Sequence, residues 1–246
     1  MNDLKHLTVY PLGDHALTIQ LSESIDNDIH QFILQMTETL EQSHFIGFIE
    51  VIPSYHNFTV FYDPIRVYNH YHETTHFSPF HFVKDFCLNT LKAATNISST
   101  EKNIIDIPVI YGDEYGPDLD YVASYNGLDH ETVIQLHSEK LYLVYMLGFA
   151  PGFPYFANVN EKIVTPRKKT PRQNNPAGSV GLAGNQTGIY SIASPGGWQV
   201  IGNTPVKLFT PTKEHPSLLK PGDYVRFKPI NQKTYDYYKE EYHYGN

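Results

Sequence analysis

The stretch that decides the fold covers residues 147–204 and reads LGFAPGFPYFANVNEKIVTPRKKTPRQNNPAGSVGLAGNQTGIYSIASPGGWQVIGNT. Residues 148–205 contain nine of the chain's 16 glycines and seven of its 17 prolines. Both residue types interrupt helices and favour turns, so we expect short strands joined by tight loops in this stretch. Apolar runs between glycine and proline continue to residue 229, and this pattern predicts a β-barrel or a sandwich.

The strands expected in this half of the chain begin with residues 141–149, which are rich in aromatic and branched side chains. The later runs cover residues 188–193, 198–202, 206–209 and 224–227. Two short helices are expected between residue 117 and the first of these strands, the second capped by Asp129. The tail from residue 235 contains five tyrosines, and its sequence leaves open whether it docks on this domain or on a partner.

The first hundred residues show a different pattern. Alternating apolar residues predict strands at 7–10, 16–21, 45–52 and 58–62, and helical spacing predicts helices at 26–41 and 78–91. Residues 93–103 are polar and without a pattern, which is typical of a linker. The sequence therefore predicts an α+β protein with a small N-terminal α/β domain at residues 1–100 and a β-barrel or sandwich domain at residues 101–246.

Charge and composition restrict the possible partners. The 246 residues carry a formal net charge of -8, yet residues 161–172 gather five cations and one acid. A local basic cluster on an acidic chain suits a small anion, whereas nucleic acid requires a broadly basic surface. No apolar run approaches the length of a membrane span, and the N-terminus does not have the pattern of a signal peptide, so we expect a cytoplasmic protein.

Arg167 and Arg172 are the main candidates for anion binding. Each follows a proline in the near-repeat T-P-R-K-K-T-P-R, and no acid lies close to Arg172 in the sequence. A stiff backbone reduces the entropy lost when guanidinium groups converge on a carboxylate or phosphate. The alternative is that both arginines are surface charges or pair with internal carboxylates.

The run PAGSVGLAGNQTG at residues 176–188 places Ser179, Gln186 and Thr187 among four glycines. Glycine lets backbone N–H groups approach a ligand closely, but turns at barrel corners explain the same spacing. His137 is a candidate general acid or base, with a capping or core role as the alternative. His70, His72, His76 and His81 form a dense patch that we interpret as a solvated loop, and we predict no metal site there.

Three runs closely resemble one known family: HSEKLYLVYMLGFAPGFPYFANV, TPRKKTPRQNNPAGSVGLAGNQTGIY and SPGGWQVIGNTPVKLF. This is the family of the 5-oxoprolinase B subunit, which includes allophanate hydrolase subunit 1, the matching part of urea carboxylase and the sporulation histidine-kinase inhibitor. The resemblance implies that the C-terminal domain is a cyclophilin-like β-barrel. It also implies a hydrolase subunit, active only in complex with the related C and A subunits, that helps convert 5-oxo-L-proline to L-glutamate using ATP and Mg²⁺ bound in the complex.

Within this family we predict catalytic roles for His137, Arg167 and Arg172. The predicted substrate-binding residues are Tyr155, Ser179, Gln186, Thr187 and Tyr190. Asn174-Asn175 departs from the basic and aliphatic pair common in relatives, which alters the expected charge of the pocket. Two alternatives remain: a binding protein that inhibits a histidine kinase without turnover, and a subunit that metabolises urea or allophanate.

Overall fold

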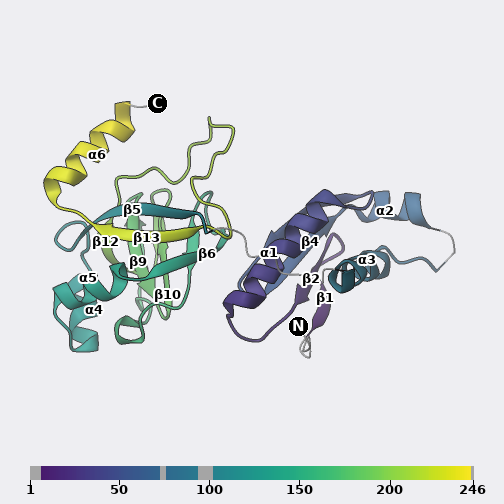
Figure 1. Ribbon diagram of the computed structural model, residues 1–246, viewed down its shortest axis with the longest axis horizontal. Coiled ribbons are helices and arrows are strands. Elements are labelled where there is room, and N and C mark those ends of the chain that lie inside the picture. The colour runs from purple at the N-terminus through teal and green to yellow at the C-terminus, as the bar shows by residue number, and fades with distance from the viewer. Residues whose placement is uncertain (1–6, 73–75, 94–101, 245–246) are drawn as a thin grey trace. The chain divides into compact units, whose positions relative to one another are not determined.

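A computed structural model describes residues 7–72, 76–93 and 102–244. The chain divides into two compact units, Met1–Thr100 and Glu101–Asn246, and each has a hydrophobic core of its own (Figure 1). Most of the expected linker, at residues 94–101, lies outside the described residues. The strands and helices together confirm the α+β class with a C-terminal barrel.

The N-terminal unit is an antiparallel sheet with helices. Its strand order is β1-β2-β4-β3, with bounds Thr8–Pro11, Ala16–Gln20, Asn57–Tyr62 and Phe48–Pro53. Helix α1, Asn27–Gln42, is capped by Asp26, because the Asp26 carboxylate accepts hydrogen bonds from the N–H groups of Asp28 and Ile29. Apolar residues of β2, β4 and α1 fill the core of this unit.

The histidine-rich stretch contains a helix that the sequence interpretation missed. Helix α2, Pro64–Tyr71, has Asp63 as its cap and proline at its first position, and α3 follows at Pro79–Ala93. His70 therefore lies on α2, where the prediction of a polar loop is wrong, and His81 lies on α3, within the helix predicted at residues 78–91. The cap signal was present, but the helix is short and mostly exposed, so its apolar periodicity was weak.

The second unit is a closed barrel of order β10-β7-β6-β13-β5-β12-β9. In chain order its strands are β5 Ile104–Tyr111, β6 Leu141–Leu147, β7 Pro154–Phe156, β9 Ser179–Ala183, β10 Gln186–Ile189, β12 Gln199–Asn203 and β13 Tyr224–Pro229. Only β5 and β13 pair in parallel among these neighbours. Residues 206–209, where we expected a strand, do not form one. Phe209 makes only an isolated β-bridge with Ser217.

Helices α4, Leu119–Asn126, and α5, His130–Ser138, confirm the two helices expected before the barrel's second strand. Their apolar residues Leu119, Val122 and Val133 are buried in the same core as the strands. The short η1, Glu161–Ile163, packs near both helices. Helix α6, Gln232–Tyr244, ends the described chain (Figure 1). None of the helices in the described ranges is long and apolar enough to cross a membrane.

Candidate functional site

The arginine-rich stretch folds into a small ribbon separate from the barrel ladder. Strand β8, Arg172–Asn175, pairs antiparallel with β11, Ser194–Gly196. The sequence RQNN has no apolar alternation, so the strand was not expected. The ribbon places the Arg172 side chain next to the loop that leads into α4, where it meets Asp118.

Asp118 binds Arg172 in a two-pronged ion pair. Its Oδ2 accepts from Arg172 Nη1 at 2.9 Å, and its Oδ1 accepts from Arg172 Nη2 at 3.0 Å. Lys168 Nζ donates to Oδ1 at 2.6 Å, and the backbone N–H of Val200 donates to Oδ2 at 2.8 Å. Burial alone would raise the pKa of Asp118, but the hydrogen bonds from Arg172, Lys168 and Val200 outweigh it and lower that pKa. Asp118 is therefore a carboxylate at neutral pH.

The ion pair leaves a positive charge at the site. Asp118 contributes one negative charge against the two positive charges of Lys168 and Arg172, so the three groups sum to +1. The Asp118 side chain is 6% exposed, whereas those of Lys168 and Arg172 are 27% and 29% exposed. Both cations can therefore contact a ligand while they remain paired. No acid lies near Arg172 in the sequence, and its partner Asp118 lies 54 residues earlier in the chain.

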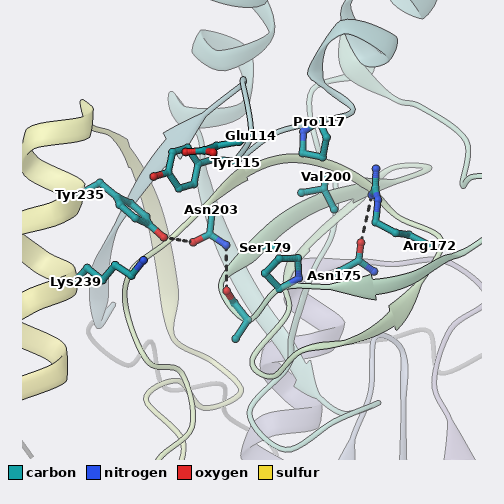
Figure 2. A pocket seen from close by; sticks show the side chains of 12 residues that line it. Glu114, Tyr115, Pro117, Arg172, Asn175, Ser179, Val200, Asn203, Tyr235 and Lys239 are labelled. Atoms are coloured by element: carbon teal, nitrogen blue, oxygen red, sulfur yellow. Dashed lines mark hydrogen bonds between the residues drawn. The ribbon is translucent and has the colours of Figure 1, made fainter.

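Arg172 lines a pocket of about 390 Å³, shown in Figure 2. Its polar lining residues are Glu114, Tyr115, Arg172, Asn175, Ser179, Asn203, Tyr235 and Lys239. Asn175 fixes the arginine from a third side, because its Oδ1 accepts from Arg172 Nη1 at 3.3 Å while its Nδ2 donates to the Ser194 carbonyl oxygen at 3.2 Å. Ser179 is only 1% exposed, and its hydroxyl has no hydrogen-bond partner among the described residues. The pocket thus offers a fixed guanidinium and a free hydroxyl.

Arg167 lies in a different environment, beside an aromatic cluster formed by Phe153, Tyr155, Tyr190 and Trp198. Its guanidinium carbon lies 5.7 Å from the Trp198 ring centroid, which is cation–π geometry. Burial raises the pKa values of the Tyr155 and Tyr190 phenols, so both remain protonated donors at neutral pH. Arg167 is exposed and, among the described residues, has no carboxylate in ion-pair range. The predicted residues Arg167, Tyr155 and Tyr190 therefore come together, apart from the Asp118 ion pair.

His137 is buried in the core of the barrel unit. The Thr187 hydroxyl donates to the Gly181 carbonyl oxygen at 3.0 Å, so it accepts from His137 Nε2, which lies 2.9 Å away. Nδ1 then accepts from the Tyr111 hydroxyl at 2.8 Å. Burial lowers the pKa of His137 to about 3, so the ring is neutral and fully hydrogen-bonded. This geometry supports the core role for His137 over the catalytic one, and Thr187 is engaged in the same network.

The remaining predicted residue, Gln186, opens β10 and is half-buried. The sequence interpretation missed Asp118 as the partner of Arg172. It also missed five polar residues that line the pocket: Glu114, Tyr115, Asn203, Tyr235 and Lys239. Asp118 did carry a signal, since it stands directly before α4 as a typical N-cap, but its carboxylate makes no capping hydrogen bond and turns to the arginine instead. In the described part of the chain no group of three or more histidine, cysteine or acidic side chains is placed to hold a metal ion.

The sequence and the fold have known counterparts. Residues 7–219 match the family model of the carboxyltransferase domain, subdomain C and D. The chain is 46% identical to the 5-oxoprolinase B subunit of Bacillus subtilis over 94% of this chain and 95% of that protein. It is 38% identical to the 5-oxoprolinase B subunit of Haemophilus influenzae over 90% and 97% of the two chains.

Solved structures share this fold. The crystal structure of TTHA0988 superposes with a TM-score of 0.75 at 36% identity, and the match covers 88% of this chain but 40% of that longer chain. Urea amidolyase of K. lactis superposes with a TM-score of 0.78 at 20% identity, which shows a shared fold. The family model matches most of the chain, and the relatives align along nearly its whole length. This chain therefore belongs to the family of 5-oxoprolinase B subunits.

Proposed function

We propose that this protein is the B subunit of an ATP-dependent 5-oxoprolinase, active with the C and A subunits in the cytoplasm. The observation that carries the proposal is the 46% identity with the Bacillus subtilis 5-oxoprolinase B subunit, which extends over 95% of that relative. Similarity over the full length covers both units of the fold, so it is not limited to a shared barrel.

The proposed reaction opens the cyclic amide of 5-oxo-L-proline to give L-glutamate. Amide resonance makes this lactam a poor electrophile toward water, and phosphorylation of the amide oxygen by ATP would make its carbon reactive. The described residues of this chain form no metal cluster, and the sequence has no Walker phosphate loop. We therefore propose that ATP and Mg²⁺ bind in the assembled complex, and we assign no step of their chemistry to this chain.

Arg172 is the residue we propose for substrate charge. Its guanidinium is held rigidly by Asp118 and Asn175 at the edge of the pocket, so little side-chain entropy is lost when an anion binds. The surplus positive charge suits the single carboxylate of 5-oxoproline or a transferring phosphoryl group. Ser179 offers its free hydroxyl to the lactam N–H or carbonyl oxygen. Arg167, Tyr155 and Tyr190 provide a second candidate contact surface.

Reconstitution tests the function. The chain is co-expressed with the C and A subunits, and ATP hydrolysis is measured with and without 5-oxo-L-proline, with urea and allophanate as alternative substrates. We expect a stable heteromer whose ATP hydrolysis depends on 5-oxoproline, and no such activity from the chain alone. Stimulation by urea or allophanate in place of 5-oxoproline would contradict the proposal, as would full activity of the chain without partners.

Variants of Arg172 test its role in that complex. Arg172→Lys keeps a cation next to Asp118 but loses the planar fork, so it isolates the contribution of geometry. If the guanidinium stabilises charge in the transition state, Arg172→Ala should cost about 2 to 4 kcal/mol, or roughly 30-fold to 1000-fold in kcat/KM, and Arg172→Lys should recover only part of that loss. Lys169→Ala removes an exposed neighbouring cation and serves as the control. Equal kcat/KM for Arg172→Lys and Lys169→Ala complexes would show that Arg172 has a structural role only.

A further inference from the structure

The C-terminal helix α6 is anchored to the barrel unit at its first turn. Asn231 caps it, because its Oδ1 accepts from the Thr234 N–H at 3.0 Å. Gln232 Nε2 donates to the Tyr115 hydroxyl at 2.9 Å, and the ring of Tyr235 packs 4.7 Å from that of Tyr115. Three contacts within one turn fix the direction in which the helix leaves β13. The sequence alone left open where this tail docks.

Tyr235 connects α6 to the pocket that contains Arg172. Its hydroxyl donates to Asn203 Oδ1 at 2.8 Å, and Asn203 Nδ2 donates to the Ala177 carbonyl oxygen at 3.0 Å (Figure 2). Tyr235 is 6% exposed. Burial, followed by the nearby Tyr115, Asp236 and Glu114, raises the pKa of Tyr235 to about 12, so the phenol remains a donor at neutral pH. The helix is thus joined to two lining residues of the pocket.

Lys239 is the only cation from α6 among the residues that line this pocket. It follows Tyr235 by four positions, so both side chains lie on one face of the helix. It lines the 390 Å³ pocket together with Arg172, and also a neighbouring pocket of about 260 Å³ with Lys207. Its ammonium lies 5.9 Å from the Tyr235 ring centroid, and no carboxylate among the described residues forms an ion pair with it. Glu114 is the single acid in the lining of the larger pocket.

We propose that α6 is a wall of the binding site, in which Lys239 attracts the carboxylate of a small substrate from the side of the pocket opposite Arg172 (Figure 2), and Tyr235 is a positioning residue. The ligand class is a small carboxylate that also carries an N–H group, because Lys239 and Arg172 supply positive charge on two sides of the pocket while Glu114 and Ser179 can accept the N–H. The identity of this ligand as 5-oxoproline rests on the proposed function. The helix lies beyond residue 219, where the match to the family model ends.

The test measures binding to the purified full chain, since every lining residue of the pocket belongs to it. NMR titration gives the Kd for 5-oxo-L-proline and for pyrrolidin-2-one, which has the same lactam without the carboxylate. We expect Lys239→Gln to raise the Kd for 5-oxoproline about tenfold to 150-fold, the range for losing one hydrogen bond to a charged group, and to leave the Kd for pyrrolidin-2-one unchanged. Lys233→Gln, which removes an exposed lysine of the same helix, should change neither value.

A double-mutant cycle tests whether Tyr235 acts by positioning Lys239 or only by stabilising the fold. Tyr235→Phe removes only the hydroxyl that holds Asn203, and it should weaken 5-oxoproline binding in the wild-type background. In the Lys239→Gln background it should add little, because Tyr235 acts through the placement of Lys239. Independent, additive losses would refute the positioning role.

The outcomes distinguish this inference from the proposed function. Absence of 5-oxoproline binding by the wild-type chain, or equal Kd values for Lys239→Gln and Lys233→Gln, overturns the role of α6. The two claims can also fail separately. If the complex shows no 5-oxoproline-dependent ATP hydrolysis, the proposed function is overturned. If the chain still binds 5-oxoproline and Lys239→Gln weakens that binding, the role of α6 in the binding site is supported.

Discussion

Asp118→Asn should destabilise the barrel unit strongly. The substitution keeps an acceptor for the Val200 N–H but removes the charge that faces Lys168 and Arg172. Removing one partner of a fully buried pair costs about 3 to 5 kcal/mol. Both cations are more than a quarter exposed and can turn toward water, so we reduce this to about 2 to 3 kcal/mol. For a unit of this size, that loss lowers the Tm by about 6 to 10 °C.

The single tryptophan makes the assay specific. Trp198 is buried in the barrel unit, so its fluorescence follows thermal unfolding of that unit and not of the N-terminal one. Asp106→Asn is the matched control, since Asp106 pairs with Arg226 at 2.7 Å but both side chains are more than 40% exposed. Equal melting temperatures for Asp118→Asn and Asp106→Asn would refute the reasoning that burial gives the Asp118 pair its strength.

The same pair predicts a pH dependence. The pKa of Asp118 is lower in the folded chain than in the unfolded chain, where a free aspartate titrates near 3.9. Its contribution to stability is therefore fully present above about pH 5 and is lost as the pH falls through the lower folded value. The difference in Tm between wild type and Asp118→Asn should be constant from pH 8 to pH 5 and should shrink in more acidic buffer. A difference that grows on acidification would contradict this assignment.

Three further predictions concern the fold. His137→Gln should lower the Tm of the barrel unit while leaving kcat/KM of the assembled complex nearly unchanged, because the buried ring is neutral and already hydrogen-bonded; a large loss of kcat/KM in a stable complex would restore its catalytic role. Gly178→Ala should cost several times more stability than Gly184→Ala in denaturant titrations, since both have positive φ but only at Gly178 does a Cβ lie 2.2 Å from the Thr204 carbonyl oxygen. Limited proteolysis should cut within residues 93–103 and release a stable fragment that begins near residue 100, and cleavage confined to residues 188–209 would argue against this division.

Much of the fold could be predicted because its signals are local. Asp129 stands before an apolar helical pattern, and it does cap α5 through the Thr132 N–H. Residues 141–149 read as a strand from their composition, and β6 occupies Leu141–Leu147. Strand β8 has no such signal, because its sequence RQNN is polar throughout. It is a strand only because it pairs with β11, Ser194–Gly196.

The candidate site was harder to predict because its contacts join distant residues. Arg172 pairs with an internal carboxylate, which the sequence offered as the alternative to anion binding. Its partner Asp118 lies 54 positions away, and the pairing depends on how the barrel closes. For His137, the local sequence could not decide between a catalytic role and a core role. Its local sequence is the same for an exposed base as for a core residue, and only its burial against Thr187 and Tyr111 distinguishes the two.

The charge balance of the pocket decides which ligand it suits. The charged side chains that line the pocket are Arg172, Lys239 and Glu114, so the lining carries a single positive charge. Asp118, behind Arg172, is shared with Lys168, which lines a different pocket. A lactam with one carboxylate matches that single positive charge. ATP with its three or four negative charges would leave several uncompensated in a partly buried pocket, which is costly because charges that leave water need partners. The electrostatics of the described pocket therefore favour a small monoanion over ATP as its ligand.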